Sequence, residues 1–392
     1  MTKTAQARIQ SIEARPLSAP LLEPFVIASA RVDTTLSVHV AATLSAEGGG
    51  GLVESAVEGL GEAASLPPVT REDQPEALAT IQRAASALAG LTLPLPDPSA
   101  LRGPDKTRAV EPLFSAIDAA LTAVVPSSPV ARAGLETAIL DAVARMLGLP
   151  VRALLGGDPG PIELVTDITI PIGDPPHMAD LARAWRDQGF SLFKVKVGKD
   201  LDHDIEALEG IARAVPGAAL RIDANAGFTS AEAIAFAREL ERRKIPIECF
   251  EQPCPTDDIE AMAEVTRAIA IPVVADESVK TLADLDRVIA AKAASGVNLK
   301  LAKSGGPLAA VAIGRAALAA GMDLMVGGMV ETRLGMTAAA HVAAALGGAR
   351  FIDLDTAWLL AEDPYEGGYR AQGPHYTLDP EPGLGVRVAT RK

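Results

Sequence analysis

The 392-residue sequence predicts an α/β fold: a parallel (β/α) barrel joined to a smaller α+β domain. Three observations predict it. From about residue 160, short apolar segments typical of buried parallel strands alternate with Ala-rich helical segments. Eight such strand segments occur, which is the number that closes a (β/α) barrel. The first 125 or so residues lack this rhythm and combine alternating apolar positions with a Pro-rich stretch, so they form the separate α+β part.

The predicted barrel strands lie within 163–172, 191–198, 219–225, 247–253, 271–278, 296–303, 322–330 and 350–355. Two of the helices between them have recognisable starts, because Thr229 and Thr281 each precede an acidic residue by three positions. An open doubly wound sheet is the structural alternative. No Gly-rich phosphate-binding loop follows any of the strands to support it.

Before the barrel, the alternation of apolar residues over 35–44 predicts strands, and the Gly48–Gly51 run predicts a turn. A helix is expected over 74–88. A second, Ala-rich helix is expected from Pro129 to Leu147, since Gly148 and Pro150 are ordinary stop signals.

Composition excludes several classes of function. The net charge of −14 argues against nucleic acid or an anionic membrane surface as a partner. No apolar run is long enough to span a bilayer, and the first ten residues lack the apolar segment of a secretory signal. The two cysteines, Cys249 and Cys254, offer neither a disulfide framework nor zinc spacing, so a reducing cytoplasm is expected.

Acidic residues end three successive predicted strands: Asp223, Glu251 and Asp276. The carboxyl ends of barrel strands meet at one rim, where barrel active sites form. Any one of these acids alone is better explained as a helix cap or a solvated loop residue. Three converging carboxylates, however, repel one another unless a cation lies between them. Oxygen ligands without Cys or His favour Mg²⁺, with Mn²⁺ as the alternative.

Lysines lie in two of the predicted strands, which is unusual for a closed barrel without sheet edges. Lys194 and Lys196 are two residues apart and therefore share a face, and Lys300 belongs to the sixth strand, nearly opposite the second. Lysines facing each other across a metal-held carboxylate suit removal of a proton from the adjacent carbon. A base on each face predicts inversion of a stereocentre, as in racemisation or epimerisation, whereas a one-sided arrangement favours elimination.

The last predicted strand ends in FIDLD, which places Asp353 and Asp355 on one face. The metal chemistry needs no further acids. Two carboxylates at the rim suit a cationic group of the substrate, such as a free α-ammonium; an ordinary polar loop start explains them equally well.

Taken together, these motifs resemble the enolase superfamily and, within it, the muconate lactonizing enzyme group. The motifs are KVK at 194–196, IDAN at 222–225, EQP at 251–253, ADES at 275–278 and NLKLAKSGG at 298–306, with GEA at 61–63 and ARMLGLPVRALLGG at 144–157. The resemblance implies a (β/α)₇β barrel at 129–359. It also implies an α+β capping domain at 1–128, completed by 360–392, that closes over the barrel mouth.

The resemblance also implies roles for the rim residues. Asp223, Glu251 and Asp276 would bind Mg²⁺. Lys196 and Lys300 would be the acid/base catalysts, and Lys194 the accessory lysine.

The DLD at 353–355 is similar to a motif of dipeptide epimerases, in which it holds the α-ammonium of an L,L-dipeptide while the C-terminal residue is epimerised through an enediolate. Two departures from that group bear on specificity: the longer segment 46–58, and DTAW after the motif. In the cap loop 22–32, which would touch the substrate, Arg31 would either pair with an acidic substrate side chain or be a solvated surface residue.

We therefore expect a metal-dependent dipeptide epimerase with a small-molecule substrate, and self-association of the barrel is a further expectation. N-acylamino acid racemisation, o-succinylbenzoate synthesis and muconate cycloisomerisation are alternatives on the same scaffold. None of them needs an ammonium pocket. A catalytically silent barrel used for binding or assembly is the alternative of a different class, and it would not need the full set of acids and lysines.

Overall fold

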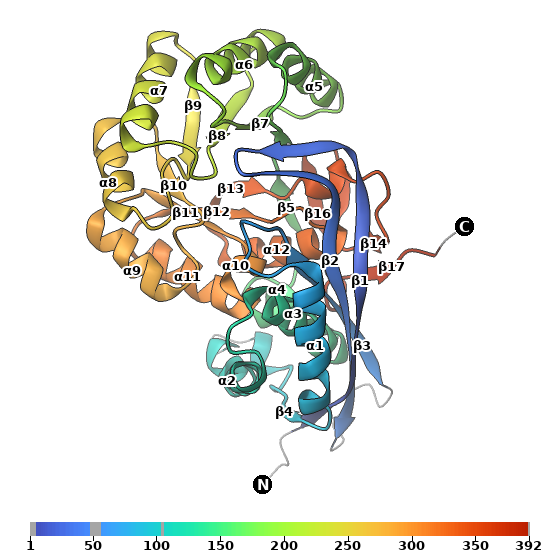
Figure 1. Cartoon of the computed structure of the whole chain (residues 1–392). Coiled ribbons are helices and arrows are strands. Elements are labelled where there is room, and N and C mark those ends of the chain that lie inside the picture. The colour runs from blue at the N-terminus through green and yellow to red at the C-terminus, as the bar shows by residue number, and fades with distance from the viewer. Residues whose placement is uncertain (1–4, 48–55, 103–105, 391–392) are drawn as a thin grey trace.

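A computed structural model describes residues 5–47, 56–102 and 106–390 of the chain (Figure 1). The described residues confirm the predicted α/β fold, with an eight-stranded parallel barrel and an N-terminal sheet beside it. None of the helices in these ranges is long and apolar enough to cross a membrane. The predicted turn at 48–51 and most of the segment 46–58 lie outside the described residues.

The N-terminal part is a four-stranded antiparallel sheet in the order β3-β2-β1-β4, covered by helices. Its elements are β1 (Gln6–Ile27), β2 (Ala30–Glu47), β3 (Val57–Ser65), α1 (Gln74–Leu88), β4 (Thr92–Pro94), η1 (Ala100–Arg102) and α2 (Lys106–Val124). The helix α1 has the bounds that the sequence predicts. It begins in a capping box in which Asp73 and Glu76 each accept a backbone N–H of the other.

The next helix, α3 (Pro129–Met146), is almost entirely buried, because it packs against β2 and β3 on one side and contacts α10 (Leu301–Ser304) of the barrel on the other. Glycines make the close packing with β3 possible. A Cβ on Gly61 would lie only 2.1 Å from the backbone oxygen of Gly134 in α3. The short α4 (Val151–Leu154) follows. The helix α3 therefore joins the N-terminal sheet to the barrel.

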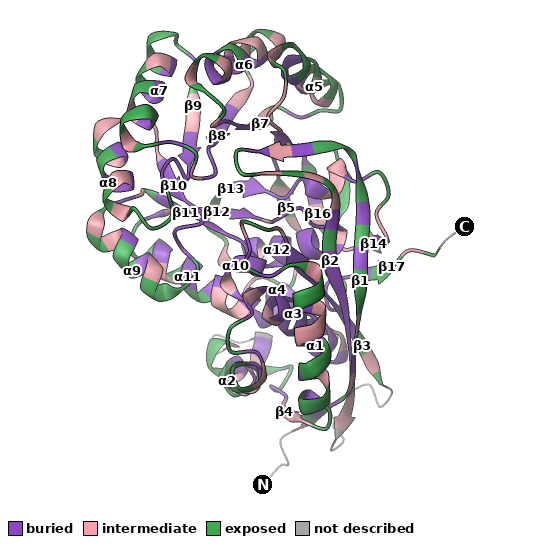
Figure 2. Cartoon of the chain, viewed as in Figure 1, coloured by how far each residue is buried: buried purple, intermediate pink, exposed green. Residues whose placement is uncertain are grey.

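The barrel strands run in chain order from β6 to β13, and all neighbours are parallel. They are β6 (Ile168–Ile170), β7 (Leu192–Lys196), β8 (Ala219–Asp223), β9 (Ile247–Glu251), β10 (Val273–Ala275), β11 (Gly296–Leu299), β12 (Asp323–Gly327) and β13 (Ala349–Asp353). The helices between them are α5 (Pro175–Asp187), α6 (Leu201–Ala214), α7 (Ser230–Arg242), α8 (Ile259–Ala268), α9 (Leu282–Ala291), α10, α11 (Pro307–Ala319) and α12 (Arg333–Leu346). Figure 2 shows the buried strands inside and the exposed outer faces of the helices.

The barrel closes between its first and last strands through few backbone bonds. The Asp167 N–H donates to the Ile352 carbonyl at 3.2 Å. Side chains complete the seam: Thr166 Oγ1 accepts the Leu354 N–H at 2.8 Å. The expected single strand at 163–172 is in fact divided, because β5 (Ile162–Val165) pairs with β16 (His375–Leu378) outside the barrel and only β6 enters it. The C-terminal tail thus takes half of that segment.

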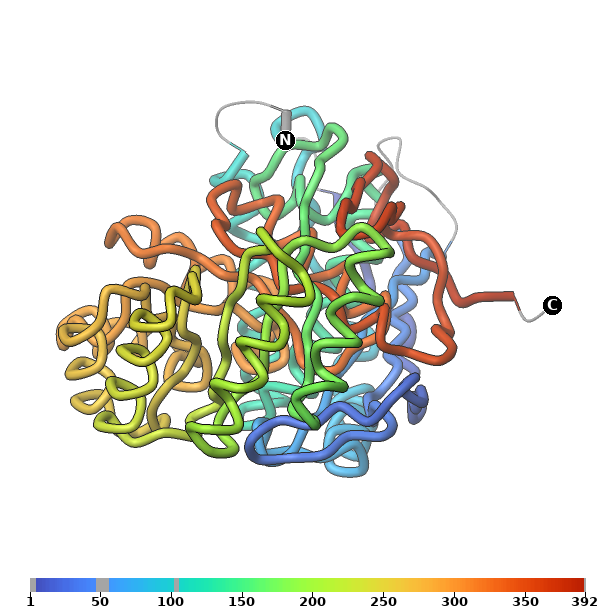
Figure 3. Tube along the Cα trace, turned by 90° about the horizontal axis from the view of Figure 1, so that it is seen from above, coloured from blue at the N-terminus to red at the C-terminus, as the bar shows by residue number. Residues whose placement is uncertain are grey.

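The N-terminal sheet is anchored to the barrel and to the C-terminal tail. The Glu62 carboxylate accepts the Thr332 and Gly335 N–H groups at the start of α12. His39 Nδ1 lies 2.5 Å from the hydroxyl of Tyr365. Tyr365 begins β14 (Tyr365–Gly367), which pairs with β17 (Val386–Val388); η2 (Thr356–Leu359) and β15 (Arg370–Gln372) complete the tail. The tip of the β1–β2 hairpin lies beside the end of β6 and the start of α5, where Val26 accepts the Ile172 N–H and Glu23 contacts His177 (Figure 3).

Candidate active site

The structure brings the predicted acids and lysines together at the carboxyl ends of the barrel strands, and all are buried. Strand register accounts for this. Lys196 on β7 lies opposite Asp223 on β8, and Asp223 lies opposite Glu251 on β9. Asp276 follows the end of β10, and Lys300 follows the end of β11.

Each of the three rim carboxylates has one oxygen fixed by the protein. Asp223 Oδ1 accepts the Asn225 N–H at 2.9 Å. Glu251 Oε1 accepts from Asn298 Nδ2 at 2.7 Å, and Asp276 Oδ1 accepts from Lys303 Nζ at 2.6 Å. Lys303 also donates to the backbone oxygens of Asp276 and Asn298. Such contacts orient a carboxylate toward whatever its other oxygen binds.

The second oxygen of each carboxylate faces lysine ammonium groups. Asp223 Oδ2 lies 2.6 Å from Lys196 Nζ. Glu251 Oε2 lies 2.7 Å from Lys194, and Asp276 Oδ2 lies 2.7 Å from Lys300. Neither Glu251 Oε2 nor Asp276 Oδ2 accepts a hydrogen bond of good geometry, despite these short ionic contacts.

These charges perturb the titration of the rim. Burial alone raises the pKa of Asp223, but the nearby Lys196 and Lys194 ammonium groups outweigh it and hold that pKa well below its usual range. Lys300 and Lys303 do the same for the pKa of Asp276. Burial and the neighbouring Asp223 raise the pKa of Glu251 to about 7. Three buried carboxylates of which one resists ionisation are a set that a divalent cation would stabilise.

Glu251 Oε2 and Asp276 Oδ2 have no hydrogen bond, and by donor type the three rim acids fit a hard divalent cation. They are not the tightest acidic group among the described residues, however. That group is Asp167, Asp353 and Asp355, whose carboxylate oxygens lie within 4.8 Å of one another. Like these two rim oxygens, Asp167 Oδ1 and Asp355 Oδ1 are buried without a hydrogen-bond partner.

Lys194 connects the two acidic groups. Its ammonium lies 2.7 Å from Glu251 Oε2, 3.1 Å from Asp223 Oδ2 and 2.8 Å from Asp353 Oδ2. Burial lowers the pKa of Lys194, but these carboxylates together raise it well above its ordinary value. Lys194 is therefore held as a positive charge between the two acidic groups.

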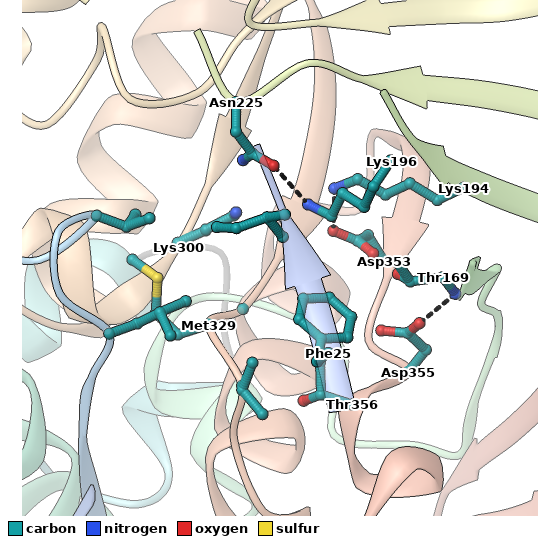
Figure 4. A pocket seen from close by; sticks show the side chains of 15 residues that line it. Phe25, Thr169, Lys194, Lys196, Asn225, Lys300, Met329, Asp353, Asp355 and Thr356 are labelled. Carbon is teal, nitrogen blue, oxygen red and sulfur yellow. Dashed lines mark hydrogen bonds and ion pairs between the residues drawn. The ribbon is translucent and has the colours of Figure 1, made fainter. Parts of the chain in front are cut away.

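A narrow pocket lies above these groups, between the barrel mouth and the β1–β2 hairpin (Figure 4). Lys300 enters it from one side, and Lys196 and Lys194 enter from the other. Phe25 of β1 covers them, with its ring centre 5.9 Å from Lys196 Nζ. Asp353 and Asp355 line its edge, where Asp355 Oδ2 accepts the Thr169 N–H at 2.5 Å.

One predicted site residue lies elsewhere. Arg31 is exposed near the start of β2, pairs with Asp33 at 3.0 Å and does not line this pocket. Conversely, the sequence reasoning assigned no role to Phe25, Thr169, Asn298 and Lys303. Asn298 had a usable signal, because it stands two residues before Lys300 in the same strand segment.

Comparison with known proteins identifies the class. The family model described as enolase C-terminal domain-like matches residues 177–392. An L-Ala-D/L-amino acid epimerase from Populus trichocarpa is 38% identical over 382 residues, which cover 96% of this chain and 84% of that protein. The chain belongs to the enolase superfamily.

Solved structures point to the same group. The substrate-liganded L-Ala-D/L-Glu epimerase from Bacillus subtilis superposes with a TM-score of 0.85 at 33% identity, over 98% of this chain and 100% of that chain. A dipeptide epimerase from Cytophaga hutchinsonii, solved with Mg and D-Ala-L-Val, gives 0.84 at 30% identity, over 97% and 96%. With such relatives along nearly its whole length, the chain is an enzyme of the isomerase class.

Proposed function

We propose that this enzyme epimerises the C-terminal residue of an L,L-dipeptide by a two-base mechanism that depends on a divalent cation. The observation that carries the proposal is the placement of two lysines around one pocket. Lys196 ends the second barrel strand and Lys300 follows the sixth, so they reach the pocket from opposite sides of an eight-stranded ring. A planar intermediate held between them can lose a proton to one lysine and regain one from the other.

Asp223, Glu251 and Asp276 would hold the cation, Mg²⁺ by donor type or Mn²⁺ in its place. When bound, it supplies positive charge beside the substrate carboxylate, where negative charge grows as the α-proton leaves. The Cytophaga hutchinsonii relative solved with Mg supports this assignment. The hydrogen bonds from Asn225, Asn298 and Lys303 keep the three carboxylates turned toward that position.

The proton transfers fall to the two lysines. One lysine must be neutral when it takes the α-proton, and the other must be an ammonium that delivers a proton to the opposite face. Reaction in the reverse direction exchanges the two roles. Phe25 covers the lysines and limits the access of water to the carbanion-like centre.

Asp353 and Asp355 would bind the α-ammonium of the dipeptide. Asp355 Oδ1 is buried and unpartnered, while its other oxygen is fixed by Thr169. A buried carboxylate oxygen without a donor is costly unless a ligand supplies one. N-acylamino acid racemisation, o-succinylbenzoate synthesis and muconate cycloisomerisation involve no such ammonium, and the free oxygen therefore favours the dipeptide over them. Contact between Arg31 and the substrate stays a prediction.

Proton exchange in D₂O tests the proposal. With Mg²⁺, an L,L-dipeptide such as L-Ala-L-Ala should gain deuterium at the α-carbon of the C-terminal residue only, and chelation should abolish the exchange. Lys196→Ala and Lys300→Ala should each lose epimerisation by several orders of magnitude, whereas Lys280→Ala on the surface should not. Unchanged epimerisation in Lys300→Ala, or unchanged turnover of dipeptides after joint substitution of Asp353 and Asp355 by Asn, would contradict the assignment.

A further inference from the structure

A second, apolar hollow adjoins the catalytic pocket at the barrel seam. It has a volume of about 180 Å³ and lies between the tip of β1, the strand β6, the helix α5 and η2. Leu22, Pro24, Leu181, Trp185 and Leu359 supply most of its walls. It shares Phe25 and Thr169 with the catalytic pocket, so the two hollows meet at these residues. We call it the seam pocket.

The seam pocket has a preformed wall and an exposed apolar rim. The indole of Trp185 is held edge-on by Phe190 and by Trp358, with ring centres 5.6 and 6.4 Å away. At the rim, Leu22 is 62% exposed, the largest exposure of any bulky apolar residue in the described part of the chain. An apolar hollow with an exposed apolar rim marks a ligand site more often than a packing defect.

The position of the ammonium site connects the seam pocket to the substrate. Thr169 bonds Asp355 through its N–H and also lines the seam pocket. In a dipeptide, the ammonium nitrogen and the side chain of the N-terminal residue are attached to the same carbon. When the ammonium of a substrate contacts the free oxygen of Asp355, the side chain of the N-terminal residue therefore begins beside Thr169.

On the basis of the proposed function, we propose that the seam pocket binds the side chain of the N-terminal residue of the dipeptide and selects a large apolar one. The volume is sufficient, since an apolar cavity of about 150 Å³ accepts a benzene-sized group. The charge at the rim disfavours acidic side chains, because Glu23 is the one ionisable lining residue and is partnered by His177 at 3.1 Å.

Ala184 allows a specific test, because it is exposed on α5 and lines the seam pocket but not the catalytic pocket. We would measure kcat/KM for α-deuteration of L-Phe-L-Ala, L-Ala-L-Phe and L-Ala-L-Ala in the wild type and in Ala184→Phe. The new ring should fill the seam pocket and lower kcat/KM at least tenfold for L-Phe-L-Ala, while L-Ala-L-Ala and the isomer L-Ala-L-Phe change less than twofold. Ala235→Phe, at another exposed alanine, on α7, is the matched control and should change none of the three.

The outcomes separate this inference from the function on which it rests. Unchanged turnover of L-Phe-L-Ala in Ala184→Phe, or an equal loss for all three dipeptides, would overturn the seam pocket while leaving dipeptide epimerisation in place. A selective loss for L-Ala-L-Phe would assign the hollow to the C-terminal residue instead. If the wild type deuterates none of the three dipeptides, the proposed function falls, and the inference falls with it.

Discussion

Replacement of Asn298 by Leu tests whether the rim carboxylates form a cation site. Asn298 is buried, and its amide donates to Glu251 Oε1 at 2.7 Å. Leucine has a similar size and removes the donor without changing the charge of the site. A hydrogen bond to an ionised group contributes about 1.5–3 kcal/mol, which corresponds to roughly 10- to 150-fold in a dissociation constant. Removing a hydrogen-bond partner of a metal-binding side chain typically costs about 10- to 100-fold in metal affinity.

Titration calorimetry of the metal-free protein with Mg²⁺ measures the effect. We expect the Kd for Mg²⁺ to rise by about 10- to 100-fold in Asn298→Leu. Thr166→Val is a suitable control, because it also deletes a buried side-chain hydrogen bond, to the Leu354 N–H, but lies at the barrel seam. It should lower the melting temperature and leave the Kd unchanged. An Asn298→Leu protein that binds Mg²⁺ as tightly as the wild type would refute this reasoning about Glu251.

Three further predictions concern pH and packing. Burial and the neighbouring Asp353 raise the pKa of Asp355 to about 6, so kcat/KM for a dipeptide should fall as pH drops through 6; a pH–rate profile without this limb would contradict the ammonium site. Burial raises the pKa of Glu331 to about 8. In the unfolded chain this carboxyl has its ordinary pKa of 4.5, so the folded state loses stability as pH rises from 4.5 to about 8. The melting temperature of Glu331→Gln should therefore fall less between pH 6 and 9 than that of the wild type. Parallel curves for the two proteins would contradict this prediction. Finally, Gly61→Ala forces a Cβ to within 2.1 Å of a backbone oxygen and should cost about 1–3 kcal/mol or more in the free energy of unfolding measured by chemical denaturation. In Gly210→Ala, inside α6, the nearest atom lies 3.6 Å from the new Cβ, an ordinary packing distance, and the substitution should not destabilise the protein.

Much of the site could be predicted because strand geometry is periodic. Lys194 and Lys196 share a face by the two-residue alternation, and Asp223 and Glu251 end neighbouring parallel strands, so their convergence requires only the barrel. The alternation of strands and helices predicted the fold class, which the structure confirms. A role for Asn298 could also have been predicted, since it shares a face with Lys300. An uncharged amide in an apolar strand is, however, a weaker signal of a site than a buried charge.

The remainder depends on contacts between distant segments, which no local pattern encodes. Phe25 and Leu22 reach the barrel because a hairpin folds over it, and the seam pocket exists only where that hairpin, α5 and η2 meet. The division of the expected strand at 163–172 is another example. The break falls at Thr166 and Asp167, and neither is a glycine or proline that would mark it in the sequence. It arises because the C-terminal strand β16 pairs with β5.

The barrel seam has a consequence for how this enzyme can diversify. Asp355 serves twice: one carboxylate oxygen fastens the Thr169 N–H across the gap between the first and last barrel strands, and the other is free for a ligand. On the proposed function, a substitution of Asp355 would alter substrate recognition and loosen the closure of the barrel at once. The exposed Ala184 of α5 lines the seam pocket but takes no part in closing the barrel. On the proposed function, substitutions in the walls of the seam pocket would change the substrate preference of this enzyme without loosening the barrel seam.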